Sequence, residues 1–460
     1  MSNDIVKTKK PVDFTVGPIL GPLFKFMLPV FAALLLQSLY GAADLLIVGQ
    51  FGEPFNVSGV SMGSHITHTV TAIIAAFATG TTVLVGQFLG KKMRKEAGRA
   101  IGASIVFFAI MAIVFTGVLI VLAEPALTLF KTPVEAMGEG TIYTRICAMG
   151  MIFIVAFNVL GSIFRGIGDS RTPLIAVGIA CVVNVFGDLL LVGVLKMAAA
   201  GAAIATVSAQ AISVVLSLLL IRRKALPFDF SRSFIRFDKK LIGRVVKLGL
   251  PLALQEVVVS GSFLVVSAIV NTMGLMASAA VGVGGRITMF IVLLPSAYSQ
   301  SLSAFVAHNI GARKYERAKK ALVHGIWTSL IYACLIFLLV FFRGDLLTQL
   351  FTQDPELIAA AALYLKGFAF DSFMTAFLFC LIGFCNGCGK TGISLFHSMV
   401  GVAVRVSTSL FFLHMQGVTL FHMGLSTPLA SFCQNILCII YLLIVSKKLK
   451  EKYSSETIKS

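Results

Sequence analysis

The chain has 460 residues, of which 57% are hydrophobic and only 13% charged, and its mean hydropathy is +0.94. A soluble globular protein carries about a quarter of its residues as charged side chains, so this composition excludes a soluble, fibrous or disordered chain. The apolar residues lie in runs of roughly twenty or more, which is the length of a helix that crosses a bilayer. The sequence therefore predicts an all-α integral membrane protein.

The formal net charge of +18 is concentrated in a few polar segments. Cytoplasmic loops of membrane proteins carry an excess of Lys and Arg, so these segments are expected to face the cytoplasm. They are expected to contact anionic membrane lipid and no nucleic acid, and the predicted location is the cell inner (plasma) membrane. The basic segments are 1–25, 89–99, 165–171, 221–244, 312–320, 386–392 and 446–460.

Twelve transmembrane helices fit the hydropathy pattern. An even number places both termini on the cytoplasmic side, in agreement with the charge distribution. No cleavable signal peptide is expected, because the first 21 residues are polar and contain Pro and Gly. In chain order the predicted spans are roughly 22–51, 57–88, 100–122, 141–164, 172–195, 198–220, 245–272, 277–306, 321–342, 358–384, 393–414 and 418–445.

The longest polar interval, Arg222 to Lys240, separates two sets of six spans. We therefore expect an N-terminal six-helix bundle over 1–221 and a C-terminal six-helix bundle over 241–447. A cytoplasmic linker over 222–240 joins them, and a basic cytoplasmic tail covers 448–460.

The two halves repeat each other. The sequence VGQFLGKK at 85–92 recurs as VAHNIGAR at 306–313, and GIGDS at 166–170 recurs as GCGKT at 387–391, both at a spacing of 221 residues. Pro29 matches Pro251 at a spacing of 222. Six spans per half give both repeats the same orientation, so we expect a pseudo-twofold axis along the membrane normal.

Four acidic residues lie inside the predicted spans: Asp44, Asp188, Glu256 and Asp371. An ionisable group inside the bilayer costs on the order of 3 kcal/mol or more, so each one needs a functional or structural reason. The structural alternatives are a salt bridge that fixes helix packing, or a side chain that reaches a water-filled cavity without coupling to transport.

Asp44 and Asp188 make the strongest pair. Counted at about 1.5 Å per residue, Asp44, Asp188 and Thr206 all lie roughly 10–12 Å below the outer surface. Asn184 precedes Asp188 by one helical turn and shares its face. Two carboxylates, an amide oxygen and a hydroxyl suit Na⁺ as hard oxygen ligands suit Ca²⁺, and paired carboxylates also favour binding of a proton.

Several motifs stand out together: the Pro29 helix, DLLIVG at 44–49, VGQ at 85–87, RGIGD at 165–169 with TP at 172–173, Asn184 with Asp188, and GAAIAT at 201–206. In these motifs the chain resembles the multidrug and toxic compound extrusion (MATE) transporters, and within them the DinF-like branch. The resemblance implies antiport, in which a substrate leaves as H⁺ or Na⁺ enters, and it points to Asp44, Asn184, Asp188 and Thr206 as the cation site. Together with Pro29 inside the first span, it also suggests a hinge at that residue.

Several other polar residues are candidates for the substrate cavity. Gln37 lies two turns before Asp44 and Tyr40 flanks it, while Asn158 in the fourth span resembles a polar position of the family. His65 and His68 are one turn apart and are candidates for proton transfer, although structural hydrogen bonding is the commoner role of such residues.

In the second half the oxygen cluster is not duplicated, because Asn184 aligns with Arg405. Glu256, Asp371 and Arg405 are instead expected near the middle of the bilayer. A structural Asp371–Arg405 ion pair is the favoured interpretation, and a charged substrate pocket is the alternative. The Cys385-x-x-Cys388 pair is expected to be reduced and structural, because no second pair accompanies it.

We therefore predict a secondary active antiporter that exports small amphiphilic organic compounds, organic cations above all, in exchange for inward H⁺ or Na⁺. No cofactor or metal beyond the coupling ion is expected, and the protein is expected to act as a monomer. The alternative is a flippase-like exporter of a lipid-linked, anionic or zwitterionic substrate. An enzyme is not expected, since the sequence has no nucleophile with a base, no His-rich metal motif and no phosphate-binding loop.

Overall fold

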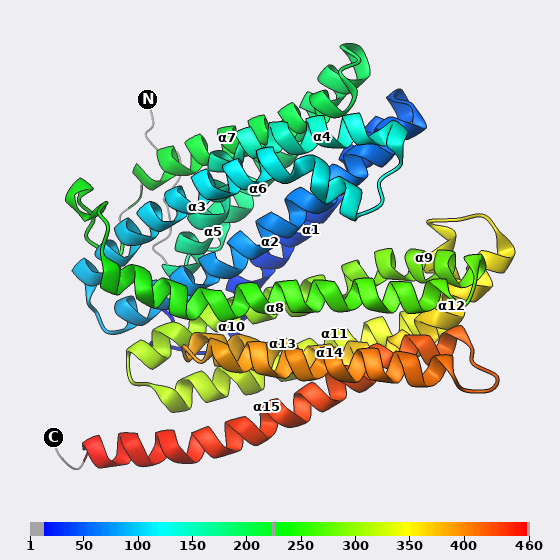
Figure 1. Cartoon of the computed structure of the whole chain (residues 1–460). Helices are drawn as coiled ribbons and strands as arrows, with labels where there is room; N and C mark the ends of the chain where they lie inside the picture. Colours follow the sequence, from blue (N-terminus) through cyan, green and yellow to red (C-terminus); the bar gives the residue numbers. More distant parts are fainter. Residues whose placement is uncertain (1–12, 223, 225, 458–460) are drawn as a thin grey trace, which may run out of the picture. The chain divides into compact units, whose positions relative to one another are not determined.

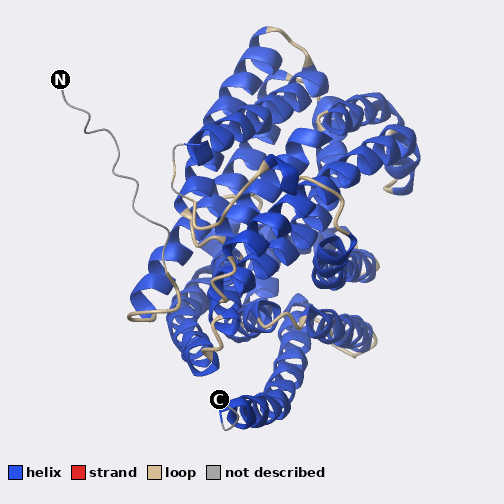
Figure 2. Cartoon of the chain, turned by 90° about the vertical axis from the view of Figure 1, so that its left-hand side faces the viewer, coloured by secondary structure: helices blue, strands red, loops and turns tan. Residues whose placement is uncertain are grey.

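The computed structural model describes residues 13–222, 224 and 226–457, and within these ranges all regular structure is helical (Figures 1 and 2). In the described part of the chain, ten helices are long and apolar enough to cross a membrane, and two bent helix pairs bring the number to twelve if each pair is one span. The all-α class and the twelve spans are thus confirmed. The helices are α1 (Leu20–Phe51), α2 (Pro54–Gly90), α3 (Arg94–Leu129), α4 (Val134–Met149), α5 (Met151–Gly166), α6 (Arg171–Asp188), α7 (Ala198–Arg222), α8 (Lys239–Asn271), α9 (Leu275–Ile291), α10 (Leu293–Gly311), α11 (Tyr315–Gln349), α12 (Pro355–Ala369), α13 (Asp371–Gly387), α14 (Thr391–Leu413) and α15 (Leu420–Thr457).

The two bent spans occupy equivalent places in the two repeats. α4 and α5 meet at Gly150 with a bend of 59°, and α12 and α13 meet at Phe370 with a bend of 46°. Asp371, the first residue of α13, follows Gly150 at the same 221-residue spacing that relates the sequence repeats. A break at the same position in both halves indicates that the repeat is structural as well as sequential.

The backbone turns repeat as well. Lys92 and Arg313 have φ of 60° and 59°, and Gly168 and Gly389 have φ of 82° and 76°. Each pair is related by the 221-residue spacing, and each residue lies in a tight connection between two helices. The glycine-containing motifs GIGDS and GCGKT are therefore left-handed turns at helix ends, where glycine is favoured because it has no Cβ.

The chain forms two compact units. The first contains the residues up to Ala253, together with Ser303–Ala321 and Gly387–Gly389. The second contains Leu254–Leu302, Leu322–Asn386 and the chain from Lys390 onward. Short stretches of the second sequence repeat therefore belong to the first unit.

One such stretch holds the segment that precedes α1. Phe14 is completely buried and its ring packs edge-on against Phe26, with a centroid distance of 5.1 Å. Arg317, on α11, donates hydrogen bonds to the carbonyl oxygens of Phe14, Val16, Gly17 and Pro18. One guanidinium group thus fixes a loop whose carbonyl oxygens have no helical partners.

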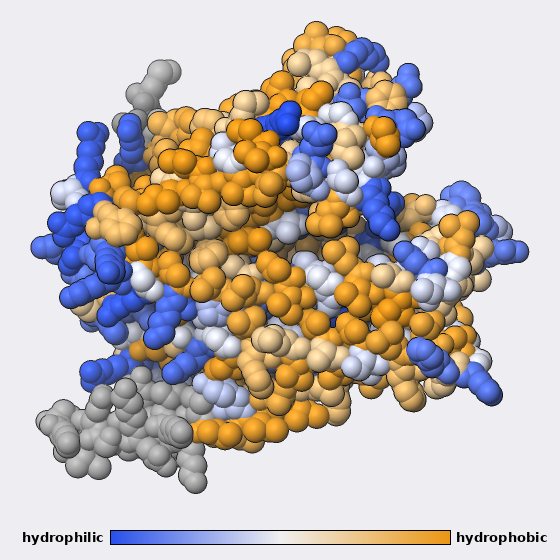
Figure 3. Space-filling model, in the orientation of Figure 1, coloured by the Kyte–Doolittle hydropathy of each residue, from blue (hydrophilic) through white to orange (hydrophobic). Residues whose placement is uncertain are grey.

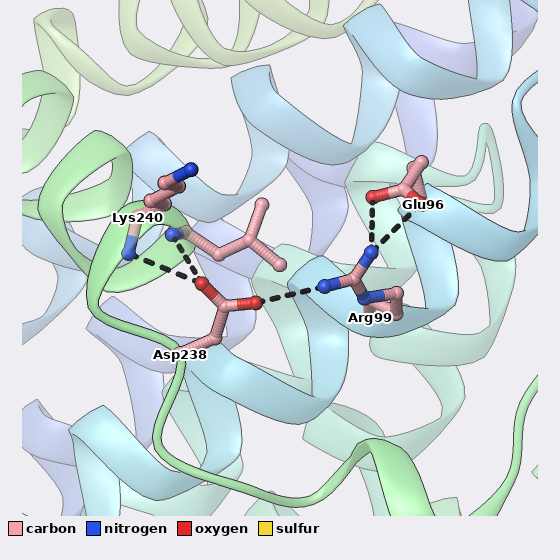
Figure 4. Close-up of polar contacts among 5 residues, drawn as sticks. Glu96, Arg99, Asp238 and Lys240 are labelled. Atoms are coloured by element: carbon pink, nitrogen blue, oxygen red, sulfur yellow. Dashed lines mark hydrogen bonds and ion pairs between the residues drawn. The ribbon is translucent and has the colours of Figure 1, made fainter.

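The connection between the repeats is anchored by a polar network (Figure 4). Asp238 accepts hydrogen bonds from the backbone N–H groups of Lys240 and Leu241 at the start of α8, and Arg99 on α3 donates to its other oxygen at 3.1 Å. Arg99 also donates to Glu96. The hydrogen bond from Leu241, followed by those from Lys240 and Arg99, lowers the pKa of Asp238 despite the opposing effect of burial.

A second carboxylate outside the membrane caps α6. Asp169 accepts hydrogen bonds from the N–H groups of Arg171 and Thr172, and Lys224 forms an ion pair with it at 2.7 Å. Burial raises the pKa of Asp169, but the hydrogen bonds from Lys224 and Thr172 outweigh burial and leave the pKa below its ordinary value. Negative charge at a helix N-terminus is stabilising, which gives this residue of the GIGDS motif a structural role.

Hydrophobic residues dominate the middle of the visible face, and hydrophilic residues gather toward its two ends (Figure 3). Large apolar side chains are exposed along the spans, for example Ile113, Val121 and Leu335. In water such a surface would drive aggregation, whereas in a bilayer it faces lipid. The multi-pass membrane protein expected from composition is therefore the one observed.

Candidate functional site

A buried polar cluster lies where α1, α6 and α7 pack against one another in the first unit. Asp44 belongs to α1 and Thr206 to α7, and both are buried. Asn184 and Asp188 lie one turn apart on α6, and Asp188 is 0% exposed. These four residues, all expected from the sequence, are called the N-terminal cluster below.

Small residues bring α6 and α7 close enough to form the cluster. A Cβ added at Gly187 on α6 would press against Ala205 on α7, and one added at Gly201 would press against Leu191. Close approach of helix backbones at Gly and Ala is the usual way in which membrane helices associate. The small residues therefore set the spacing that lets short side chains from the two helices meet.

Two hydrogen bonds connect the cluster. Asn184 donates from Nδ2 to the Thr206 hydroxyl at 3.3 Å, and Thr206 donates from Oγ1 to Oδ2 of Asp44 at 3.2 Å. The carboxyl groups of Asp44 and Asp188 also interact with each other. Residues that are far apart in the sequence are thus joined into one polar group.

The cluster has more acceptor oxygens than donors. Oδ1 of Asp44, Oδ1 of Asn184 and both carboxylate oxygens of Asp188 are buried and accept no hydrogen bond from the described residues. Buried acceptors without donors are costly, and two carboxylates that share a buried site cannot both stay ionised without a counter-charge. A Na⁺ ion or one or two protons would supply what is missing. The arrangement thus has the oxygen ligands and the missing positive charge that would suit a small cation.

A π-helical segment follows the cluster directly. Leu189–Val194 continues α6 with this wider winding, beginning at the residue after Asp188. π-Helical turns are rare and are found most often at functional sites. In the second repeat the corresponding end of α14 is regular α-helix.

Sequence reasoning missed the polar shell around Asp44. Tyr143 and Cys147, one turn apart on α4, both lie close enough to interact with the Asp44 carboxyl, and Tyr143 also contacts Thr206. Gln210 lies one turn after Thr206 on α7 and contacts Tyr40. A usable signal was present: Tyr143 and Thr206 are matched by Tyr364 and Thr427 at the repeat spacing.

The other candidates of the first half lie at the margin of this group or outside it. Tyr40 interacts with Asp44, and Gln37 is half-buried on the same helix. Asn158 donates a hydrogen bond to the carbonyl oxygen of Ile154 within its own helix. His65 and His68 interact with each other on an exposed face of α2.

Pro29, the expected hinge, lies inside α1, which continues as one helix from Leu20 to Phe51. The proline leaves the carbonyl oxygen one turn earlier without its usual helical donor. One backbone hydrogen bond of α1 is therefore missing at Pro29, as expected for a hinge, and bending at this residue stays a prediction.

The second unit buries two charged side chains of opposite sign. Arg405 on α14 is 7% exposed and Asp371 at the start of α13 is 2% exposed. The expected Asp371–Arg405 ion pair is wrong for this structure: among the described residues no ion-pair contact joins them. Arg405 instead donates to the Ser262 hydroxyl at 2.9 Å and lies over the Phe263 ring at 4.5 Å. Stacking on an aromatic face and a neutral hydrogen bond replace the salt bridge.

Glu256 differs from the other acidic residues of the spans because its side chain is exposed on α8. Cys385 and Cys388 lie near the end of α13, and no group of three or more His, Cys, Asp or Glu suited to a metal occurs in the part of the chain that is described. Glu256 and the two cysteines are therefore not counted with the N-terminal cluster or with the buried Arg405 and Asp371.

Comparisons with known proteins agree with this picture. The MatE family model matches residues 29–190 and 251–411, once in each repeat. The chain is 27% identical over 362 residues to the probable multidrug resistance protein YpnP of Bacillus subtilis (strain 168), which covers 78% of this chain and 81% of that protein. It is 24% identical over 358 residues to an FAD transporter of Shewanella oneidensis, covering 76% and 78% of the two chains.

The fold is shared with solved transporters. A MOP superfamily transporter from Pyrococcus furiosus superposes with a TM-score of 0.91 at 18% identity, covering 97% of this chain and all of that one. For that protein the reverse polarity of its binding pocket suggests a different function. At this level of identity the likeness concerns the fold alone.

Proposed function

Because the chain belongs to the MatE family, we propose that it is a secondary active antiporter that exports small amphiphilic organic compounds as H⁺ or Na⁺ moves inward. The observation that carries the proposal is the pair of buried carboxylates, Asp44 and Asp188, since three of their four oxygens accept no hydrogen bond from the described residues. Ionisable groups inside a membrane protein mark ion and proton pathways.

The coupling chemistry follows from the charge of the cluster. Without a cation, the two carboxylates repel each other, and the hydrogen bond from Thr206 on α7 to Asp44 on α1 is opposed by this repulsion. A bound cation removes the repulsion and draws the helices together. The cation therefore stabilises one arrangement of α1 over another, which is what a coupled transporter requires.

The conformational change in this proposal is a bending of α1. The helix carries Asp44 near its second end and Pro29 near its first, and Pro29 lacks the backbone N–H that would stiffen that turn. Cation binding at Asp44 would bend or straighten α1 at this hinge and reshape the cavity that holds the substrate. Gln37 and Tyr40 lie between the hinge and the cluster, so their surroundings would change with it.

Several finer features belong to the same proposal. The protein would lie in the plasma membrane with both termini in the cytoplasm, because the basic segments favour that side. It would act as a monomer, since each chain contains a complete cluster within its first unit.

The test is efflux of a fluorescent organic cation from proteoliposomes under an imposed pH or Na⁺ gradient. Efflux driven by one gradient and lost in both Asp44→Asn and Asp188→Asn supports the proposal and identifies the ion. Efflux that persists in both variants, with wild-type insertion and folding, would refute it. Asp229→Asn is the matched control, because Asp229 is an exposed carboxylate whose ion pair within the described residues is with Arg94 at the surface.

A second candidate is export of an anionic or zwitterionic substrate, including a lipid-linked one. It is favoured by the buried positive charge of Arg405, which would repel a simple organic cation. The relative from Shewanella oneidensis is an FAD transporter, and FAD carries negatively charged phosphates. Gradient-driven efflux of an anionic dye but not of a cationic one would favour this candidate.

A further inference from the structure

The two repeats place polar clusters at equivalent positions but give them different charges. Tyr143 and Thr206 of the first cluster recur as Tyr364 and Thr427, so part of the framework is kept. Asn184 is replaced by Arg405 at the same spacing. At the same spacing Asp188 is replaced by Ser409 and Gln210 by Ser431. Asp44 is replaced by Val266 at the spacing of 222 that relates Pro29 to Pro251.

The replacement removes both carboxylates of the cation cluster and introduces a guanidinium. The second cluster is therefore unsuited to a small cation at the position of Arg405. By contrast, the basic residues Arg145, Lys247, Arg286 and Lys366 within the spans are all exposed. Arg405 is buried, although a buried charge is costly unless it is paired.

Arg405 retains unused hydrogen-bonding capacity. One guanidinium nitrogen donates to Ser262, but the buried Nε has no acceptor among the described residues. Ser409 lies one turn further along the same buried face of α14, and its hydroxyl also has no partner there. An arginine and a hydroxyl that share one face present donors suited to a carboxylate.

Asp371 is the buried acidic residue of the second unit, opposite in charge to Arg405. Oδ1 of Asp371 is buried and accepts no hydrogen bond from the described residues. The charges of Asp371 and Arg405 interact although no ion-pair contact joins them, and Tyr364 interacts with both. Both side chains are buried in the second unit, where charges interact more strongly than they do in water.

We propose that Arg405 with Ser409, and Asp371 opposite them, form a binding site in the second unit for zwitterionic amphiphiles. The carboxylate of the ligand would accept hydrogen bonds from Arg405 and Ser409, and its cationic group would pair with Asp371. This inference rests on the proposed export function, since it names the class of compound exported. A purely cationic ligand would be repelled by Arg405 and a purely anionic one by Asp371.

The experiment compares two dyes that differ in one group. Tetramethylrhodamine with a free carboxylate is a zwitterion, and its methyl ester is a cation with the same ring system. Binding of both is measured by fluorescence polarisation with the purified full-length protein. Wild-type protein is expected to bind the free acid at least about tenfold more tightly than the ester.

Arg405→Gln is expected to weaken binding of the free acid by at least about tenfold and to change binding of the ester by less than about twofold. Ser409→Ala is expected to act in the same direction by about threefold, which provides a second variant should Arg405→Gln fail to fold. Asp371→Asn is expected to weaken both dyes alike, because both carry the cationic group. Arg286→Gln is the matched control, since it removes an exposed basic residue from a span.

Equal binding of the two dyes, failure of the free acid to bind to folded wild-type protein, or an equal effect of Arg405→Gln on both dyes would overturn the site. In those cases buried water molecules, and not a ligand, supply the missing hydrogen-bond partners of Arg405 and Asp371. Efflux under the ion gradients is measured with the same preparations. Selective binding of the free acid without gradient-driven efflux would refute the antiport proposal and support the binding site. Gradient-driven efflux without selective binding of the free acid would support the antiport proposal and refute the binding site.

Discussion

The two buried charge clusters of this protein lie at corresponding places in its two repeats and differ in chemistry. The N-terminal cluster holds two carboxylates, an amide and a hydroxyl, and its unsatisfied atoms are acceptors. The cluster of the second unit holds Arg405, Asp371 and several hydroxyls, and its unsatisfied atoms are donors as well as acceptors. Helix arrangement therefore does not decide what a cluster binds. A few substitutions on the same framework suffice to change a cluster with only acidic charges into one with both signs of charge.

The same contrast applies to the packing that surrounds the clusters. Ser213 donates a hydrogen bond to the carbonyl oxygen of Ala176 between α6 and α7, and Gln434 donates to that of His397 between α14 and α15. The two bonds are equivalent at the 221-residue spacing, but Gln434 is longer than Ser213. Gly401 makes room for it where the first repeat has Ala180. The repeats thus keep the contact and adjust the neighbouring volume.

The largest expected effect concerns coupling. Asp188→Asn should reduce gradient-driven efflux by at least about 100-fold, because one carboxylate of the cation site is lost while size and hydrogen bonding are kept. Initial efflux rates from proteoliposomes measure this, with Asp229→Asn as the surface control. If Asp188→Asn keeps more than a tenth of the wild-type rate, the N-terminal cluster is not the coupling site and the contrast between the repeats loses its functional meaning.

The next effect concerns stability. A Cβ at position 401 overlaps the Gln434 amide, so Gly401→Ala should lower the free energy of unfolding by about 1–3 kcal/mol. Thermal unfolding of the purified protein in detergent measures the change. Adding Gln434→Ser to Gly401→Ala recreates the arrangement of the first repeat and should restore most of the loss. A double variant no more stable than Gly401→Ala would contradict the packing argument.

A smaller effect separates the two equivalent threonines. Thr206→Val keeps the shape of the side chain but removes the hydroxyl that links Asn184 to Asp44, so the apparent affinity for the coupling ion should fall about tenfold. Thr427→Val, at the matching position of the second repeat, should change it by less than about twofold. Efflux rates across a series of ion concentrations give both values. Equal effects of the two substitutions would mean that both clusters take part in ion binding.

The smallest effect concerns acid stability at the helix ends. The pKa of Asp169 is below its ordinary value in the folded protein, so the unfolded state binds the proton more tightly. The contribution of Asp169 to stability is therefore fully present above about pH 4 and is lost as the pH falls through its folded-state pKa. Asp169→Asn should cost about 1 kcal/mol at neutral pH and flatten the decline of stability in acid.

Lys390 occupies the matching position in the second repeat, so this pH-dependent cap is present only in the first. Unfolding temperatures measured from pH 7 down to pH 3 test the prediction, with Asp229→Asn as a surface carboxylate of little expected effect. If the unfolding temperature falls equally steeply with pH in Asp169→Asn and in the wild type, groups other than Asp169 control the loss of stability in acid.

Much of the fold could be predicted from the sequence because the bilayer imposes strong constraints. Runs of apolar residues predicted twelve spans, and the repeat spacing predicted two related halves. Some predicted spans were shorter than the helices observed, for example 57–88 against α2 (Pro54–Gly90). Hydropathy detects only the apolar part of a helix and misses the polar residues at its ends. The breaks at Gly150 and Phe370 were missed, since a bend inside an apolar run leaves no mark on its hydropathy.

The candidate site was predicted in part. Asp44, Asn184, Asp188 and Thr206 were found because buried charge in a membrane helix is rare and helix length gives depth. Tyr143, Cys147 and Gln210 were missed, because neutral polar residues in spans are common and most of them serve packing. Their role depends on which helix faces which, and that is a property of the packed bundle.

The sequence by itself thus determined the class, the number of spans, the repeat and the short list of charged residues, because each of these follows from the free energy of moving a residue from water into lipid. Only the tertiary structure decided how the charges are paired. Depth alone allowed an ion pair between Asp371 and Arg405, but the packing of α8 against α14 turns Arg405 toward Ser262 and Phe263 instead. Pairing depends on side-chain direction and helix rotation, which are fixed by contacts across the bundle rather than by position along the chain.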